Sequence, residues 1–512
     1  MIEAIVIYLR VCLTRKTIPT PSYSELIFKK EYSMKNKSGN KPGFGNKPRK
    51  EKAVKKPVYV DDGSPRLQQP RKEKLEQPLD NMRLAEMTID RMGHDGRGIS
   101  TWNRKTLFVE GALTGEKVTA RLLQNHSRYA EARLDQITEA SPDRVVAQCE
   151  HYAECGGCQL QHAKAETQLA IKQAAVFEQV QRWGEVKLKK IIDPILSPAY
   201  AYRRSARLAI DERQEPLLLG FRQANSHQLV AIESCSVLVP ELSELIVPLR
   251  KLLIDLETKN AISHIDLVAA DRKVMIFRQQ AILSNQDYEK LRQFDNQYQC
   301  AIYLQPKRSS DLVDLQQQAA DPRLFYELKS YALNIGFHPL DFIQVNADVN
   351  EKMVAQALNL LDVKPDETVL DLFCGIGNFT LPLATQAKKV IGIEGQESMV
   401  LRGRENAQRL GLNNVEFVAA DLEKIGVPRL RHLCGSLDAV LMDPPRDGAK
   451  ASVSLLAQLT PKRIVYVSCN PATLARDTKE LLAAGYKLDA LGVVDMFPQT
   501  AHVESMALFV RR

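Results

Sequence analysis

The chain has 512 residues, of which 44% are hydrophobic and 26% charged, and this length is too great for a single hydrophobic core. No run approaches the roughly 18 consecutive apolar residues of a membrane helix, so we expect no membrane association. Thirteen lysines and arginines but only six acidic residues lie between Lys35 and Asp80, so most of the net charge of +8 falls in that stretch. Clustered cations favour a polyanionic partner, although a solvated tail that only aids solubility explains the charge equally well.

The first 80 residues, 1–80, predict a disordered basic tail. Residues 2–13 are apolar, but Glu3 and Arg10 interrupt them and no small-residue cleavage site follows, so a signal peptide is not indicated. From Met34 the sequence is rich in Lys, Asn, Gly and Pro, a composition that cannot bury enough apolar surface to fold alone. This abrupt change leads to the hypothesis that Met34 is the true start.

Residues 81–146 predict a small β-barrel. Short strand-like runs alternate with Gly and Asn turns, including GHDGRG at 93–98. The pattern resembles the TRAM domain, an OB-like barrel found on RNA-modifying enzymes, which implies an RNA-binding surface. Small barrels also occur that bind nothing in particular.

Residues 147–330 predict a central α+β domain that contains a group of cysteines. Cys149, Cys155 and Cys158 are separated by five and two residues, and Cys235 is the obvious fourth thiol. Four thiolates suit a zinc ion or an iron–sulfur cluster, and zinc usually favours two paired knuckles, which this segment lacks. Nine cysteines in 512 residues do not resemble a secreted disulfide framework, so we expect a cytoplasmic protein.

Residues 331–512 predict an α/β domain with a doubly wound parallel sheet, because strand-like runs alternate with helical segments. The first strand leads into a glycine-containing turn, DLFCGIGNFT, where such sheets bind a nucleotide-like ligand. Glu394 ends the next strand and can accept the hydrogens of ribose hydroxyls, while Asp421 ends the following strand and can contact an adenine amine. NAD also fits Gly375 and Gly377, but the third glycine of the dinucleotide fingerprint is missing.

Cys469 and Glu504 are the candidate reacting residues. Cys469 ends a strand in YVSCNPATLARD, beside the strand that leads to Asp443 in LMDPPRDG. Free cysteines are most often buried for packing, but a strand-end thiol at the ligand-binding edge is placed for nucleophilic attack. A thiolate that adds to carbon 6 of uracil makes carbon 5 nucleophilic enough to take a methyl group, and a base must then remove the hydrogen of carbon 5. Glu504 is the candidate base, although a glutamate near a terminus is ordinarily solvated.

Four segments, DLFCGIGNFT, DPPRDG, SCNPATLARD and HVESMALF, together resemble the uridine-carbon-5 RNA methyltransferase family, and the resemblance extends over residues 82–512. It implies a class I, Rossmann-like methyltransferase domain that uses S-adenosylmethionine, with Cys469 as nucleophile and Glu504 as base. It also implies that Phe342 lies against the target base. The residues implied for the cofactor and substrate pocket are Gln344, Phe373, Asn378, Glu394, Asp421 and Asp443.

The cysteine spacing and the TRAM-like segment are similar to the ribosomal RNA branch of this family. That resemblance implies a 4Fe-4S cluster on the four cysteines named above, and 23S ribosomal RNA as the partner of a monomeric enzyme. Methylation of a uridine in another ribosomal loop or in tRNA is the alternative within the same class. A non-catalytic RNA-binding assembly factor is the alternative from a different class, and it would lack Cys469 or Glu504, both of which are present.

Overall fold

The computed structural model describes residues 81–512 except 214, 225, 308 and 310. The described residues all lie in one compact unit of the chain. The predicted basic tail and the hypothesis about Met34 therefore lie outside the described residues. In the described part of the chain, no helix is long and apolar enough to cross a membrane.

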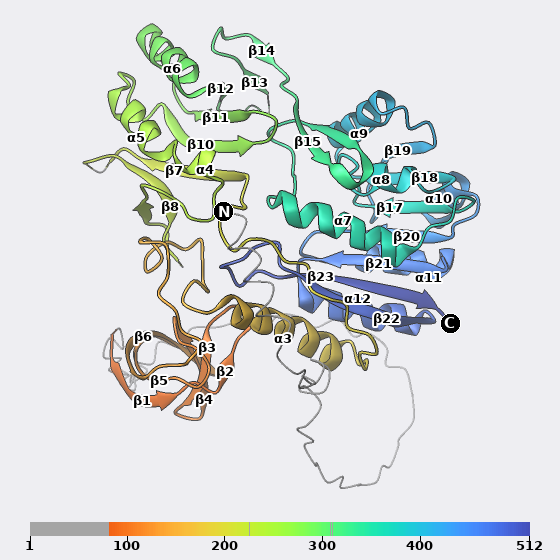
Figure 1. Ribbon diagram of the computed structural model, residues 1–512, viewed down its shortest axis with the longest axis horizontal. Coiled ribbons are helices and arrows are strands. Elements are labelled where there is room, and N and C mark those ends of the chain that lie inside the picture. Colours follow the sequence, from red (N-terminus) through yellow and green to blue (C-terminus); the bar gives the residue numbers. More distant parts are fainter. Residues whose placement is uncertain (1–80, 214, 225, 308, 310) are drawn as a thin grey trace, which may run out of the picture. The chain divides into compact units, whose positions relative to one another are not determined.

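Residues 83–139 form a six-stranded sheet with a hydrophobic core of its own, and the short strands predicted for this region are present (Figure 1). The strand order is β1-β5-β6-β4-β3-β2, and all neighbours are antiparallel except β4 and β6. Val118, Ala120 and Leu122 alternate along β5 and are all buried, as a strand with one covered face requires. The strands are β1 (Arg83–Thr88), β2 (Arg91–Met92), β3 (Gly98–Trp102), β4 (Lys105–Glu110), β5 (Lys117–Asn125) and β6 (Tyr129–Glu139).

The central region is built on an eight-stranded sheet with the order β14-β13-β12-β11-β10-β7-β8-β9. Three helices contribute to its core, where Leu242, Leu249 and Leu291 pack with Ile265 and Leu267 of β10. The strands are β7 (Ser205–Asp211), β8 (Leu218–Arg222), β9 (Leu229–Ala231), β10 (Ile262–Ala269), β11 (Lys273–Gln279), β12 (Cys300–Gln305), β13 (Leu312–Val313) and β14 (Ala319–Ala320). The helices are α4 (Pro240–Ser243), α5 (Ile246–Asp255) and α6 (Asn285–Tyr298).

The C-terminal region holds a seven-stranded sheet with the order β19-β18-β17-β20-β21-β23-β22. Strands β17 to β22 all run in the same direction, as predicted for a parallel sheet, and β23 alone is antiparallel to its neighbours β21 and β22. The strands are β17 (Thr368–Leu372), β18 (Lys389–Glu394), β19 (Val415–Ala419), β20 (Ala439–Met442), β21 (Arg463–Ser468), β22 (Tyr486–Val494) and β23 (Glu504–Arg511). A hairpin of β15 (Leu324–Leu328) and β16 (Leu333–Phe337), joined by the short helix η1 (Lys329–Tyr331), precedes this sheet.

Helices cover both faces of the seven-stranded sheet. Val369 and Leu370 are neighbours in β17 but belong to different cores, because successive side chains of a strand point to opposite faces. The first core includes side chains of α7 (Ala347–Leu361), α8 (Thr380–Ala384) and α9 (Glu397–Arg409). The second includes side chains of α10 (Val427–Cys434), α11 (Lys450–Leu459) and α12 (Pro471–Ala483). Both faces are thus buried, which explains the near-continuous apolar runs of the strands.

Helix α3 (Ala165–Trp183) packs on this C-terminal sheet, although the sequence grouped it with the central domain. Val176, Phe177 and Val180 of α3 share the second core with α12, and Figure 1 shows the two helices side by side. The chain beyond α3 then runs along β22, where the Ile192 and Ile195 N–H groups donate to backbone oxygens of that strand. The sequence of a helix does not by itself specify which surface the helix covers.

Candidate active site

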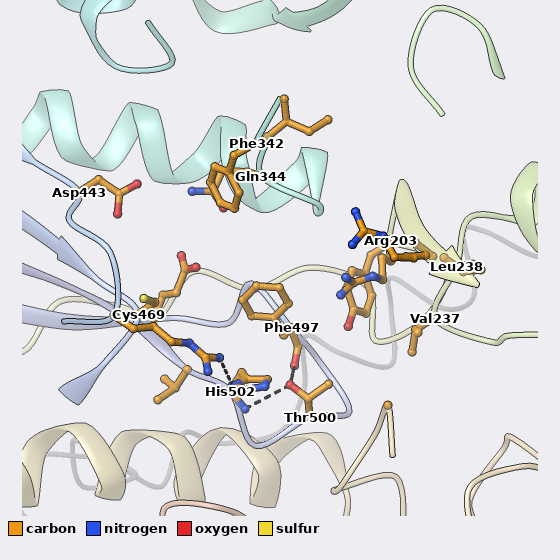
Figure 2. A pocket seen from close by; sticks show the side chains of 18 of the residues that line it. Arg203, Val237, Leu238, Phe342, Gln344, Asp443, Cys469, Phe497, Thr500 and His502 are labelled. Atoms are coloured by element: carbon orange, nitrogen blue, oxygen red, sulfur yellow. Dashed lines mark hydrogen bonds between the residues drawn. The ribbon is translucent and has the colours of Figure 1, made fainter. Parts of the chain in front are cut away.

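A cavity of about 1060 Å³ is lined by twelve of the thirteen predicted site residues. The twelve are Cys149, Cys155, Cys158, Cys235, Phe342, Gln344, Phe373, Asn378, Glu394, Asp443, Cys469 and Glu504. Asp421 is the exception, because it lies exposed after β19, where it accepts hydrogen bonds from the Glu423 N–H and, at 2.6 Å, from Lys424 Nζ. Its role toward a cofactor stays a prediction. Figure 2 shows Asp443 and Cys469 on one side of the cavity and Arg203 and Leu238 on the other.

The strand register brings Cys469 and Glu504 together. Ser468, the last residue of β21, pairs with Ser505 of the antiparallel strand β23. Cys469 and Glu504 are the next residues of the two strands, so they face each other where the sheet ends. Glu504 is 6% exposed, and its Oε2 atom has no hydrogen-bond partner among the described residues.

Burial dominates the electrostatics of the reacting groups. It raises the pKa of Glu504 to about 8, with a further contribution from Asp443, and it raises the pKa of Asp443 to about 7. The pKa of Cys469 is raised by burial, then by Glu504 and Asp443, whereas Arg446 lowers it. Without ligands, the site therefore favours a neutral Cys469 thiol and a protonated Glu504 near pH 7. A cationic ligand placed among these groups would favour their ionised forms.

The glycine-containing turn after β17 has a conformation that its sequence explains. Phe373 and Gly377 both have positive φ angles, of 63° and 102°. A side chain at Gly377 would bring its Cβ within 2.9 Å of Leu381 and Phe417, so glycine is required for packing as well as for backbone conformation. The Gly375 N–H donates to Glu394 Oε2 at 3.2 Å, which orients this carboxylate at the edge of the cavity.

Asn378 is held in one orientation by two neighbours. Tyr326 Oη donates to Asn378 Oδ1 at 2.9 Å, and Asn350 Nδ2 donates to the same oxygen at 3.0 Å. Asn378 Nδ2 returns a hydrogen bond to Asn350 Oδ1 at 2.9 Å. Asn378 Nδ2 carries two hydrogens and donates one of them to Asn350, so the other is left to meet a ligand. The Asn378 oxygen already accepts two hydrogen bonds.

Phe342 and Gln344 lie in the segment before α7, on the same side of the cavity (Figure 2). Phe342 is 70% exposed, whereas Gln344 is buried. Arg204 Nε donates to the Gln344 backbone oxygen at 2.9 Å, so the central region fixes this segment. The exposed ring of Phe342 is available to a planar partner, and Gln344 is pre-positioned by the fold.

The four predicted cysteine ligands line one end of the cavity, and all are free thiols. Their proximity is evident from their electrostatic effect on one another, since burial and then Cys235, Cys155 and Cys149 raise the pKa of Cys158 to about 12. The Gly157 N–H donates to Cys155 Sγ at 3.4 Å. Within the described residues, no group of three or more His, Cys, Asp or Glu side chains meets the requirements for holding a metal ion.

Several residues of the cavity were not singled out from the sequence. Arg446, in the DPPRDG motif, places Nη2 at 3.2 Å from His502 Nδ1, and His502 belongs to the HVES motif, so both had a sequence signal. Phe497 and Thr500 also line the cavity, and Thr500 Oγ1 donates to the Phe497 backbone oxygen at 2.9 Å (Figure 2). Nothing in their local sequence distinguishes these two from ordinary loop residues.

Comparison with known proteins identifies the fold first. The crystal structure of Pyrococcus abyssi tRNA (uracil-54, C5)-methyltransferase in complex with S-adenosyl-L-homocysteine matches with a TM-score of 0.63 and 24% identity. The match covers 83% of this chain and 100% of that one. The predicted class I methyltransferase fold is therefore confirmed.

The sequence comparisons define the family. The model of the family described as tRNA (Uracil-5-)-methyltransferase matches residues 165–512. A protein of Alkalilimnicola ehrlichii named 23S rRNA (uracil(1939)-C(5))-methyltransferase RlmD is 44% identical over 430 residues, covering 83% of this chain and 96% of that protein. A Legionella pneumophila protein of the same name is 42% identical over 438 residues, covering 84% and 98% of the two chains. The chain belongs to the uridine-carbon-5 RNA methyltransferase family, as its four motifs predicted.

Proposed function

We propose that the protein transfers a methyl group from S-adenosylmethionine to carbon 5 of a uridine in 23S ribosomal RNA. The observation that carries the proposal is the pair formed by the Cys469 thiol and the unpartnered Glu504 carboxyl group, facing each other in one cavity with the glycine-containing turn. The relatives named for this reaction match this chain over almost their whole length, which supports the same substrate class. We expect the protein in the cytoplasm, where a thiol such as Cys469 stays reduced.

The cofactor side of the cavity suits an adenosine-containing methyl donor. S-adenosylmethionine supplies an electrophilic methyl group and a positive charge when it is bound. Glu394 can accept hydrogen bonds from ribose hydroxyls, because its two oxygens retain free lone pairs beside their backbone partners. Gln344, Phe373 and Asn378 complete this side.

Cys469 and Glu504 divide the chemistry between them. The Cys469 thiolate adds to carbon 6 of the uracil, and the electron pair displaced from the double bond makes carbon 5 nucleophilic. Carbon 5 takes the methyl group as the S–CH3 bond of the donor breaks and its electron pair stays on sulfur, which leaves S-adenosylhomocysteine. Carbon 5 then still carries its hydrogen. Glu504 removes that hydrogen as a proton, and the electron pair of the broken C–H bond re-forms the double bond as Cys469 leaves. A buried carboxylate with a raised pKa is a stronger base than an exposed one.

The target uridine must be unpaired or flipped out, because carbon 6 is shielded in a stacked helix. Phe342 provides an exposed aromatic ring on which the extruded base can stack. We assign RNA binding outside the cavity to the six-stranded sheet of residues 83–139, in keeping with its resemblance to TRAM domains.

We further propose that Cys149, Cys155, Cys158 and Cys235 hold a 4Fe-4S cluster. The donor set fits this group, because four free thiols from two separate segments line one end of the same cavity. The N–H donated by Gly157 to Cys155 Sγ would stabilise a thiolate ligand. The role of these residues is structural or RNA-positioning, because the cysteine spacing differs from the C-x3-C-x2-C spacing of radical enzymes.

Incubation of purified protein with unmodified 23S ribosomal RNA and isotopically labelled S-adenosylmethionine tests the proposal. Nuclease digestion and mass spectrometry should find one labelled 5-methyluridine. Label only in a parallel incubation with unmodified tRNA would select the alternative substrate. RNA binding without any methyl transfer would select the assembly-factor alternative.

A further inference from the structure

The connection between β22 and β23, residues 495–503, is referred to as the base loop. β22 ends at Val494, which pairs with Glu504 at the start of β23. The base loop therefore starts beside the cross-strand partner of Glu504 and ends next to Glu504 itself. It contains no helix or strand, so contacts from other segments determine its shape. Phe497, Thr500 and His502 of the base loop line the cavity.

Lys172 of α3 contacts the base loop although it lies 323 residues before Asp495 in the sequence. Its Nζ donates to Asp495 Oδ1 at 2.6 Å and to the Phe497 backbone oxygen at 2.9 Å. Lys172 is 1% exposed, and a buried ammonium is tolerated only when it is paired and hydrogen-bonded. The two bonds fix the first residues of the base loop relative to α3.

Gln168, one turn earlier in α3, holds the middle of the base loop. Its Nε2 donates to Gln499 Oε1 at 3.0 Å, and the Gln499 N–H donates back to Gln168 Oε1 at 3.0 Å. Gln499 is 3% exposed and has a φ angle of 70°, a conformation that a non-glycine residue adopts only when its surroundings impose it. The Gln159 and Leu160 N–H groups both donate to the Gln499 backbone oxygen at 3.0 Å.

We propose that Lys172 is a positioning residue for the proton-abstraction step, acting through the base loop on Glu504. Lys172 is not among the residues that line the cavity, so it acts without touching the substrate. It is fixed by α3, whose apolar face packs in the core against α12. This inference rests on the proposed function, in which Glu504 removes the hydrogen of carbon 5. Loss of Lys172 should therefore slow the removal of the carbon 5 hydrogen rather than the addition of the Cys469 thiolate to carbon 6.

The test compares wild-type protein with Lys172→Met on two RNAs. On RNA with 5-fluorouridine at the target, proton abstraction is impossible, so both proteins should be trapped covalently to the same final fraction. On ordinary RNA, Lys172→Met should accumulate an adduct that survives SDS, which wild-type protein does not. Its kcat should fall roughly 10- to 100-fold, with the KM for S-adenosylmethionine unchanged.

Lys479→Met is the matched control. Lys479 Nζ bonds to Glu185 at 2.6 Å in an exposed ion pair between α12 and the segment after α3, with no contact to the base loop. This variant should behave like the wild type. If Lys172→Met is unstable because Asp495 is left without its cation, Lys172→Met/Asp495→Asn removes the buried charge while still lacking the donor to Phe497.

Four outcomes distinguish the explanations. The inference is supported if Lys172→Met accumulates the adduct on ordinary RNA and is also fully trapped on 5-fluorouridine RNA. A reduced trapped fraction with no adduct on ordinary RNA would mean that Lys172 only stabilises the fold, and wild-type behaviour would mean that it does not position Glu504. If wild-type protein itself is never trapped, the proposed function fails rather than the role of Lys172 alone.

Discussion

The half-buried Asp443 and the buried Glu504 carry two carboxyl groups that face the same cavity, and the proximity of Asp443 adds to the rise in the pKa of Glu504. Asp443 follows β20 and Glu504 begins β23, so the sheet brings together two acids that are distant in the sequence. Ionising both acids without a nearby cation is unfavourable. Binding of a positively charged methyl donor would therefore prepare Glu504 to act as a base.

The buried Glu504 should make the folded protein less stable as the pH rises. The pKa of Glu504 is about 8 in the folded protein, against a reference value of 4.5, so the unfolded chain ionises first. The contribution of the protonated Glu504 to the stability of the folded protein is complete below the reference pKa, and it is lost as the pH rises through the pKa of the folded state. Glu504→Gln should therefore gain stability relative to the wild type by about 1.4 kcal/mol per pH unit between those values. Chemical denaturation at several pH values, without ligands, measures this difference.

Glu423→Gln is the control for that series, because Glu423 is exposed. The comparison separates the effect of the Glu504 position from the effect of replacing an exposed glutamate by glutamine. If the stability difference between Glu504→Gln and the wild type did not change with pH, this would contradict a buried, protonated Glu504.

Arg446 should promote ionisation of the nucleophile. Its positive charge lowers the pKa of Cys469 against the opposing effects of burial, Glu504 and Asp443. Arg446→Gln should move the midpoint of Cys469 alkylation by iodoacetamide to higher pH, as judged by mass spectrometry of the Cys469 peptide. Arg446→Lys keeps the charge and should show a smaller shift. An unchanged midpoint in Arg446→Gln would mean that the thiol does not sense this cation.

Phe342 should contribute to RNA binding but not to folding. Its side chain is 70% exposed, so Phe342→Ala should leave the thermal stability unchanged. Loss of a stacking surface should raise the KM for RNA roughly tenfold while the KM for S-adenosylmethionine stays the same. Leu401→Ala, at an exposed position of α9 outside the cavity, controls for removal of an apolar surface side chain. Equal KM increases for both substrates would argue against stacking.

Anaerobically purified protein should be brown and should contain about four iron and four sulfide per chain. Cys158→Ser should lose the colour and the iron. Cys434→Ala should keep both, because Cys434 is buried in α10, outside the cavity. Stoichiometric zinc without visible absorption would show that the four cysteines bind a different metal.

The sequence predicted those features of the site that depend on local patterns. Apolar runs that end at Glu394, Asp443 and Cys469 place these residues at one edge of a parallel sheet, because the carboxyl ends of parallel strands share an edge. The motif resemblance added Phe342 and Gln344, which have no strand to position them. Both residues line the cavity, and their contacts with cofactor and target base stay predictions.

Features that depend on contacts between distant segments were not predictable. Lys172 reads as an ordinary charged residue of a helix, and its burial depends on Asp495, which lies 323 residues away. Tyr326 and Asn350 orient Asn378 through tertiary contacts that leave no local pattern. The packing of α3 on the C-terminal sheet is of the same kind, since an amphipathic helix does not specify which surface it covers.

The most direct test of the account is the fate of the covalent adduct in Cys469→Ala and Glu504→Gln, because the two residues act at opposite ends of its lifetime. Cys469→Ala should form no RNA-linked species and no 5-methyluridine. Glu504→Gln keeps the thiol but lacks the base, so its kcat should fall roughly 10²- to 10⁴-fold, and a methylated adduct should accumulate that survives SDS. Turnover by Cys469→Ala, or Glu504→Gln that shows neither adduct nor loss of rate, would contradict the roles assigned to these residues.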